Sequence, residues 1–214
     1  MTITKMKNKS FNSTLIKTII LGIILIFPSK VQAQNDLPSP SELRGKPSEA
    51  EQQKLDQQQS RQAIVRQGIQ LYQDRNYAAS EAIFRQLVEN QPKEAKYHFY
   101  LGNSLFYQRK IEEATQAYQE AINLNPKYAL AYNSLGFLHA SQGQWDEAIA
   151  QYQKALEINP DYAEALKNLG ESLWKKGNTA EANNAWKKAL ELYTQQGNNK
   201  AVKQLEQLLS QTAQ

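Results

Sequence analysis

The sequence predicts an all-α protein in which about four helical hairpins stack into a solenoid that ends in a C-terminal capping helix. Three features predict this class: a glycine and an aromatic residue each recur every 34 residues, and a proline closes three successive periods. These residues are Gly68, Gly102, Gly136 and Gly170; Phe84, Tyr118, Tyr152 and Trp186; and Pro92, Pro126 and Pro160. A fixed period of this length indicates a repeat architecture.

The clearest unit covers residues 129–162 and has the pattern of two short helices. Apolar residues recur at helical spacing in each half, and Gly143 lies between the halves. Glycine can take the left-handed backbone conformation that ends a helix at little cost. Pro160 follows the second half, where proline cannot continue a helix but can begin the next one. Each unit is therefore expected to be a helical hairpin.

The period, with its Leu-Gly pair, small residue, aromatic residue and closing proline, resembles the tetratricopeptide repeat (TPR) family. The resemblance implies a right-handed solenoid, and with the N-terminal segment described below it indicates an exported bacterial member. The expected units are residues 61–94, 95–128, 129–162 and 163–196. The pattern drifts in the first and last units, as expected for terminal repeats that lack a neighbour on one side.

The repeats predict eight helices, and a ninth is expected in the segment 197–214 after the break at Gly197. The eight are expected at residues 61–74, 77–90, 94–108, 111–123, 128–142, 145–158, 162–176 and 179–194. Apolar residues at three- and four-residue spacing predict the ninth helix, which should cover the open apolar edge of the fourth unit. They are Ala201, Val202, Leu205, Leu208 and Leu209.

Residues 1–33 have the pattern of a secretory signal peptide that is cleaved after Ala33. The segment has five lysines and no acid, with an apolar run over residues 18–27 that Pro28 closes. The alternative is an uncleaved membrane anchor, but a spanning helix needs about 20 apolar residues and this run is about half as long. We therefore expect export to the periplasm or another extracytoplasmic space, with anchoring through residues 1–33 as the alternative.

Residues 34–60 are expected to form a flexible to partly helical linker. The first part is rich in proline and serine and has too few apolar groups to order itself. Ser48 and Glu51 fit a capping box, which predicts that a solvated helix leads into the first repeat. This lead is rich in glutamine, so disorder is the alternative.

Charge and composition argue against several functions. The chain has 25 basic and 21 acidic residues, but without the five lysines of residues 1–33 the balance is 20 against 21, a net charge of −1. A nucleic-acid-binding role thus loses its main support. The chain has no cysteine, which excludes disulfides, thiol chemistry and lipid attachment at cysteine.

No pattern of catalytic or cofactor-binding residues is present. The two histidines, His98 and His139, occupy repeat positions that are apolar or aromatic in the other units, so each is expected to be a partly buried residue with one hydrogen bond. The glycines follow the repeat and form no phosphate-binding loop. We expect no enzyme activity, no cofactor and no metal.

The first helix of the second unit has two apolar stripes. One contains Leu101 and Leu105, and the other contains Phe99, Asn103 and Phe106. In the TPR family the second stripe and its equivalents line the concave surface that binds partners. The resemblance therefore implies a groove formed by Val65, Ile69, Tyr72, Phe99, Asn103, Phe106, Asn133, Phe137, Ala140, Lys167, Glu171 and Trp174. The alternative is that some of these rings pack between neighbouring first helices.

One well-known type of TPR protein is not supported. Chaperone-binding members hold a terminal carboxylate with a set of Lys, Asn and Arg residues. Of the five matching positions here, only Asn103 agrees, and a register one unit earlier is no better. The positions are Phe99, Asn103, Ser134, Glu164 and Asn168.

Two hypotheses follow. The first is an exported adaptor or assembly factor that binds a protein or peptide segment in its groove; the family includes exported proteins that assist the assembly of membrane complexes, photosystems among them. The second is a structural protein whose groove is filled by its own chain, through self-association or through residues 34–59 folding back. An enzyme would need a reactive group that the sequence does not supply.

Overall fold

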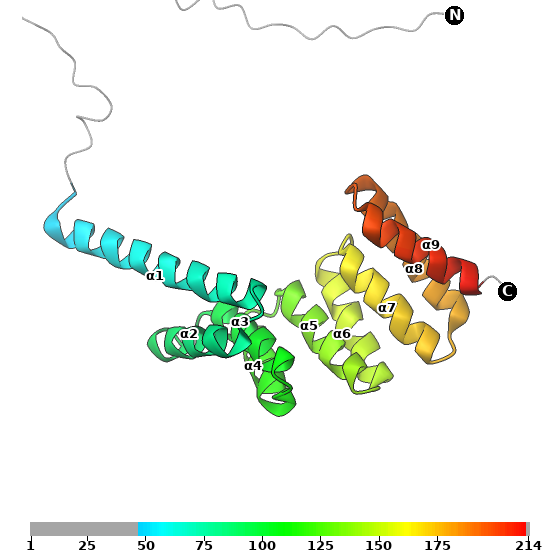
Figure 1. Cartoon of the computed structure of the whole chain (residues 1–214), viewed down its shortest axis with the longest axis horizontal. Coiled ribbons are helices and arrows are strands. Elements are labelled where there is room, and N and C mark those ends of the chain that lie inside the picture. The colour runs from blue at the N-terminus through cyan, green and yellow to red at the C-terminus, as the bar shows by residue number, and fades with distance from the viewer. Residues whose placement is uncertain (1–46, 213–214) are drawn as a thin grey trace, which may run out of the picture. The chain divides into compact units, whose positions relative to one another are not determined.

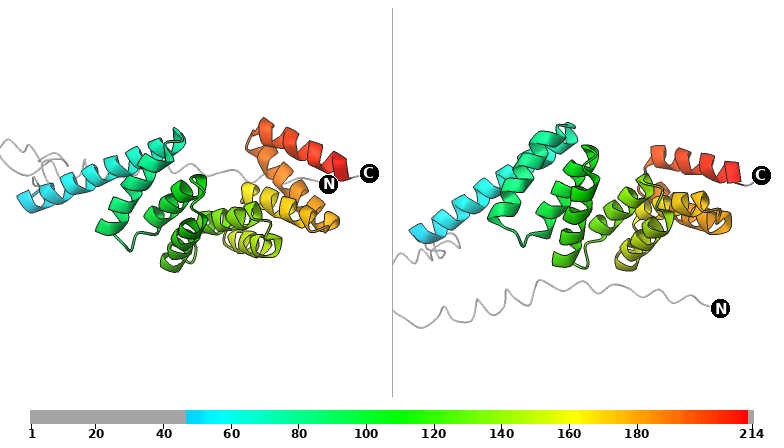
Figure 2. Two further views of the ribbon diagram at one scale, coloured as in Figure 1. Left: turned by 60° about the horizontal axis from the view of Figure 1, so that its bottom comes forward. Right: turned by 90° about the horizontal axis from the view of Figure 1, so that it is seen from below.

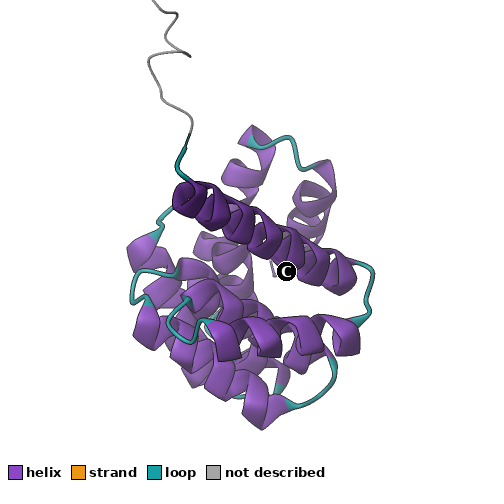
Figure 3. Cartoon of the chain, turned by 90° about the vertical axis from the view of Figure 1, so that its left-hand side faces the viewer, coloured by secondary structure: helices purple, strands orange, loops and turns teal. Residues whose placement is uncertain are grey.

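The computed structural model describes residues 47–212, which form nine helices and no strand (Figures 1 and 3). The helices are α1 (Glu49–Gln73), α2 (Tyr77–Asn90), α3 (Ala95–Tyr107), α4 (Ile111–Leu124), α5 (Ala129–Ser141), α6 (Trp145–Ile158), α7 (Ala163–Lys175), α8 (Thr179–Gln195) and α9 (Asn199–Thr212). The predicted all-α class is confirmed. The predicted signal peptide and residues 34–46 of the predicted linker lie outside the described residues.

Helices that follow one another in the chain pack against each other, so α1 to α8 form four hairpins and α9 packs on α8 (Figure 2). In addition α3 contacts α5, and α5 contacts α7. The first helices of the second, third and fourth hairpins therefore lie next to one another in order, which is the arrangement that a solenoid requires. Helices α2 to α8 begin and end within one residue of the predicted ranges.

The repeated glycine and aromatic residue form the contact between the two helices of each hairpin. A Cβ atom added to Gly102 would lie 2.7 Å from Cδ1 of Tyr118, whose side chain is buried. The equivalent pair in the fourth hairpin, Gly170 and Trp186, would give 2.5 Å. Real Cβ atoms essentially never come this close, so only glycine fits at these positions. The glycine therefore recurs every 34 residues because the two helices of each hairpin approach closely there.

The hairpin turns also repeat every 34 residues. A residue with positive φ follows the first helix of each hairpin: Arg75 at 60°, Arg109 at 64°, Gly143 at 75° and Gly177 at 89°. The predicted left-handed conformation of Gly143 is confirmed. The first two turns have arginine in a conformation that costs a non-glycine residue about 1–2 kcal/mol.

Helix α1 is longer than the helix predicted for the first repeat. It begins after Ser48, whose hydroxyl accepts from the backbone N–H of Glu51 while the Glu51 carboxylate accepts from the backbone N–H of Ser48, so the predicted capping box is confirmed. The helical lead and the first repeat helix form one continuous helix of 25 residues, with no break near residue 60. The alternative in which residues 34–59 fold back on the groove is thereby restricted to residues before Ser48.

The C-terminal helix acts as the predicted cap. Leu205 is fully buried and Ala201 nearly so, and both pack in an apolar cluster with Trp186 and Tyr193 of α8. A second apolar cluster includes buried residues from α1 to α5. No helix within residues 47–212 has both the length and the apolar character needed to cross a membrane.

Candidate functional site: a divided groove

Six of the predicted groove residues surround one cavity of about 230 Å³, which we call the central cavity. It lies where the first three hairpins and the start of α7 converge. Its lining consists of Tyr72 from α1; Phe99, Asn103, Phe106 and Tyr107 from α3; Tyr118 from α4; Leu130, Asn133, Ser134 and Phe137 from α5; Tyr162; and Glu164 from α7. The cavity thus combines aromatic rings, short polar side chains and one carboxylate.

Aromatic rings form a connected wall at the central cavity. The Tyr107 ring stacks on that of Tyr77 with centroids 4.8 Å apart and meets the Tyr72 ring edge-on at 5.7 Å. Phe106 meets Tyr107 at 5.3 Å and Phe137 at 5.6 Å. Tyr107 and Phe137 are nevertheless 49% and 45% exposed. These rings support one another and still present apolar surface to solvent.

Each of the two asparagines that line the central cavity accepts a buried hydrogen bond. The Tyr118 hydroxyl donates to Oδ1 of Asn103 at 2.8 Å, and Nδ2 of Asn168 donates to Oδ1 of Asn133 at 3.2 Å. Burial raises the pKa of the Tyr118 hydroxyl well above its ordinary value, so this group remains a neutral donor. With its oxygen occupied in this way, each lining asparagine has an amide nitrogen that suits the carbonyl groups of an extended chain.

Phe99 and Phe137 differ in a way that the repeat did not predict. Phe99 is only 7% exposed, because its ring packs among Tyr100, Tyr118 and Tyr128 at centroid distances of 5.1–6.3 Å. It lines the central cavity but mainly fills the core, as in the alternative of packing between helices. Phe137 has the larger free surface.

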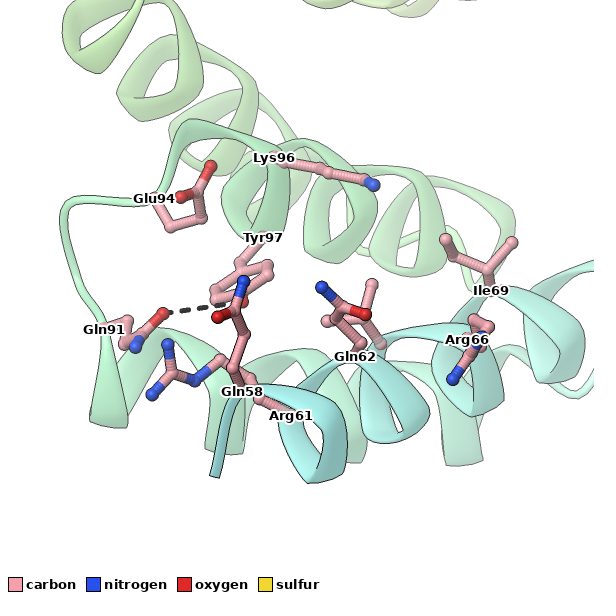
Figure 4. A pocket seen from close by; sticks show the side chains of 10 residues that line it. Gln58, Arg61, Gln62, Arg66, Ile69, Gln91, Glu94, Lys96 and Tyr97 are labelled. Carbon is pink, nitrogen blue, oxygen red and sulfur yellow. Dashed lines mark hydrogen bonds between the residues drawn. The ribbon is translucent and has the colours of Figure 1, made fainter. Parts of the chain in front are cut away.

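Val65 and Ile69 line a different cavity, of about 520 Å³, between α1 and the start of α3 (Figure 4). We call it the α1–α3 cavity. The other lining residues are Gln58, Arg61, Gln62, Arg66, Gln91, Glu94, Lys96 and Tyr97. The sequence did not single these residues out, because all but Tyr97 are polar or charged, and Tyr97 extends the stripe of Leu101 and Leu105 that packs in the core.

The C-terminal part of the predicted groove faces the cap. Lys167 and Glu171 share a cavity of about 380 Å³ with Leu208 and polar side chains of α9. Trp174 lines none of the three cavities; its ring lies 6.3 Å from that of Trp186 and beneath the ammonium group of Lys175. The predicted row is therefore divided into three parts, of which the central cavity unites the most residues.

Solved structures of similar fold were found by comparison. A crystal structure of MamA aligns with a TM-score of 0.58 and 28% identity, covering 64% of this chain and 81% of MamA. A second MamA crystal structure gives 0.57 and 28% over 64% and 75% of the two chains. PilF of Pseudomonas aeruginosa gives 0.59 and 19% over 72% and 77%, which bears on the fold alone. None of the curated proteins compared with the chain matches it.

Family models agree with these alignments. A model described as TPR repeat matches residues 102–143 and 138–177, and one described as tetratricopeptide repeat matches residues 163–195. The chain thus carries tetratricopeptide repeats over residues 102–195. It is accordingly a protein-interaction module of the scaffold type, and TPR scaffolds are generally non-catalytic.

The two histidines of this TPR protein have the predicted structural environment. Nε2 of His98 lies 2.8 Å from the backbone oxygen of Pro92, and the residue is 9% exposed. Nδ1 of His139, which is half-buried, lies 2.6 Å from Oε1 of Gln144. Among residues 47–212, no group of three His, Cys, Asp or Glu side chains lies close enough together to hold a metal ion.

Three residues that matter to the central cavity were missed from the sequence. Tyr107 lies four residues after Asn103, so the apolar stripe of α3 could have indicated it. Leu130 was visible only as an apolar residue in a first turn. Glu164 was considered only as a position of the carboxylate clamp, which it does not match, and an acidic residue at the start of a helix is otherwise expected from the helix dipole alone.

Proposed function

We propose that the chain is an exported adaptor or assembly factor that holds a segment of a partner protein in its groove, anchored at the central cavity. The supporting observation is the presentation of three large apolar side chains at that cavity. Tyr107, Leu130 and Phe137 are 49%, 44% and 45% exposed. All three line the same cavity although they come from two different hairpins.

The exposed surface is large enough to anchor a partner. An aromatic side chain can bury about 150–250 Å², so nearly half of Phe137 corresponds to about 90 Å². At about 25 cal/mol per Å², covering it would contribute about 2 kcal/mol. Aromatic residues of this kind, centred in a concave site and surrounded by polar groups, dominate many protein interfaces.

The polar lining favours an extended segment with exposed backbone groups. The amides of Asn103 and Asn133 lie beside the rings, and each has its oxygen fixed by a neighbouring donor. An apolar side chain in the cavity and backbone carbonyls on the amides would fix both position and register. Export is supported by the signal-peptide pattern of residues 1–33.

A matched pair of variants tests the anchor. Phe137→Asp places a charge in the central cavity, whereas Leu55→Asp makes the same kind of change at a leucine of α1 that is 44% exposed and lines none of the cavities described above. We expect crosslinking from the native envelope fraction to capture a partner with the natural chain and with Leu55→Asp, and to lose it with Phe137→Asp. Circular dichroism must show equal helix content in all three.

The outcomes separate the two hypotheses. Equal capture by all three chains, or capture by none, would remove the central cavity as the anchor. Light scattering over a dilution series adds the second readout: a dimer of the natural chain that Phe137→Asp converts to monomer would show that the groove is filled by another copy.

A further inference from the structure

The α1–α3 cavity has a charge that distinguishes it from the central cavity. Three of its lining residues are basic, namely Arg61, Arg66 and Lys96, and one is acidic, Glu94 (Figure 4). In the view of Figure 4, Lys96 and Glu94 lie on opposite sides of Tyr97. The cavity therefore has an excess of positive charge.

The basic groups differ in how they are held. The Gln91 amide lies between the Tyr97 hydroxyl and Arg61, and in the orientation that satisfies both its oxygen is 2.6 Å from Nη1 of Arg61. Arg66 and Lys96 are exposed, and within residues 47–212 neither forms an ion pair. Arg61 thus helps to hold α1 against the end of α2. Arg66 and Lys96 are available to a ligand, and the Lys96 ammonium group lies 5.9 Å from the centre of the Tyr100 ring.

Apolar surface lies beside these cations. Val65 and Ile69 line the same cavity, and Ile69 is only partly buried. A ligand that fits must therefore combine aliphatic groups with negative charge. Arginine binds a carboxylate through two parallel N–H groups, which makes an acidic side chain the better match than a diffuse anion.

We propose that the α1–α3 cavity binds aspartate or glutamate side chains of the same partner segment that the central cavity anchors, with neighbouring aliphatic side chains on Val65 and Ile69. This inference rests on the proposed function and adds the chemistry of the partner. Arg66 and Lys96 share the repeat positions of Ser134 and Glu164, two of the clamp positions compared above. The proposed ligand nevertheless differs from that of the carboxylate clamp, because it is an internal side chain and not the terminal carboxylate that chaperone-binding members hold.

The spacing of the two cavities predicts a sequence pattern in the partner. Val65 and Tyr72 are seven residues apart on α1, which corresponds to about 10 Å along the helix. An extended chain advances about 3.3 Å per residue, so the acidic residue should lie about three residues from the apolar anchor. Glu164 would repel an acidic residue from the central cavity, where no Lys or Arg is among the lining residues.

Synthetic peptides test this directly against the full chain. The probe is the acetylated, amidated and fluorescently labelled peptide Ser-Glu-Leu-Glu-Ser-Gly-Phe-Ser, and its matched control has Gln for both Glu. We expect fluorescence anisotropy at low salt to give a Kd about tenfold lower for the Glu probe, with the difference shrinking as salt rises. Equal affinity for the two probes, including no binding of either, would overturn the proposal.

Charge reversal locates the effect. In the Arg66→Glu, Lys96→Glu variant the Glu probe should lose its advantage, and a third probe with Lys for both Glu should bind at least as tightly as the Gln probe does. The control, Lys187→Glu with Lys203→Glu, makes the same net change at exposed lysines that line none of the three cavities. A preference for Glu that survives in the cavity variant, or that disappears in the control, would refute the assignment.

Two further probes identify the source of the carboxylate. A Gln probe with a free C-terminal carboxylate should bind no better than its amidated form; if it matches the Glu probe, a chain terminus is the ligand and the proposal fails. Unlabelled peptide of residues 34–46 should compete no better than the unlabelled Glu probe. Stronger competition would assign the cavity to the protein's own chain.

The proposed function fails separately from this inference. Loss of partner capture in Phe137→Asp, with capture retained in Arg66→Glu, Lys96→Glu, would leave the central anchor intact and exclude the acidic contact. Retained capture in both variants would exclude the groove as a whole.

Discussion

The close contact between Gly102 and Tyr118 makes a sharp prediction about stability. In Gly102→Ala the new Cβ would lie 2.7 Å from two carbons of the Tyr118 ring, whereas ordinary contact begins at 3.4 Å. The ring is 2% exposed and its hydroxyl is fixed by a 2.8 Å hydrogen bond to Asn103. It cannot move away without straining that bond.

Opposing effects set the magnitude. Replacing glycine by alanine within a helix stabilises it by about 1 kcal/mol through propensity. Overpacking a filled core costs about 2 kcal/mol, and weakening the Tyr118 hydrogen bond costs about 1 kcal/mol more. We therefore expect Gly102→Ala to lower the free energy of unfolding by about 2 kcal/mol, in spite of the better helix former.

Urea unfolding monitored by circular dichroism measures this change. The double variant Gly102→Ala, Tyr118→Leu supplies the control, because removing the ring removes the clash. The two changes should be less than additive, with a coupling of about 1–2 kcal/mol. A neutral or stabilised Gly102→Ala, or strict additivity with Tyr118→Leu, would show that the contact does not limit the approach of the helices.

Three other predictions concern stability. In the folded protein the pKa of Glu81 lies below its ordinary value of 4.5, since burial raises this pKa but hydrogen bonds from Lys110 and other side chains lower it more. The ionised carboxylate therefore contributes to stability above pH 4.5, and this contribution is lost as pH falls through the lowered pKa. Glu81→Gln should accordingly lose less stability on acidification than the natural chain, as measured by the urea midpoint across an acid titration. Arg109→Gly should raise the thermal midpoint through a net gain of about 0.5–1 kcal/mol, because the relief of about 1–2 kcal/mol of strain exceeds the cost of the greater freedom of glycine in the unfolded chain. Gly143→Ala should lower the thermal midpoint, and equal signs would contradict the left-handed assignment. Leu205→Ala, at a fully buried site, should lower the free energy of unfolding by about 3 kcal/mol, and α8 should lose its protection from hydrogen exchange before the other helices. A uniform loss of protection would argue against a local cap.

Much of the fold could be predicted because one period repeats the same packing contact. Gly102 and Tyr118, like their equivalents, are required wherever two helices of a hairpin meet, so their spacing fixes the register of α2 to α8. The start of α1 was found through local chemistry, the capping box of Ser48 and Glu51. The unbroken length of α1 could not be predicted, since its glutamine-rich first half is exposed throughout and has no periodic signal.

The site was less predictable, because exposure depends on neighbours in other repeats. Phe99 and Phe137 lie in similar helical stripes, yet Phe99 is surrounded by rings from its own hairpin and from Tyr128, whereas Phe137 meets only the edge of Phe106. Lys167 was assigned to the groove by its repeat position, and there α9 supplies the opposite side of the cavity. The spacing of residues within one repeat cannot show how an element outside that repeat limits the exposure of a given position.

One repeat position illustrates how the solenoid separates folding from recognition. The residues at this position, spaced 34 apart, are Gln62, Lys96, Leu130 and Glu164. The first two line the α1–α3 cavity and the last two line the central cavity. Nothing in the packing of a hairpin requires these residues, which is why they differ while the glycine does not. Along the groove they change from polar through basic and apolar to acidic. A partner that matches this order has one favourable direction of binding, because reversing it would place like charges together.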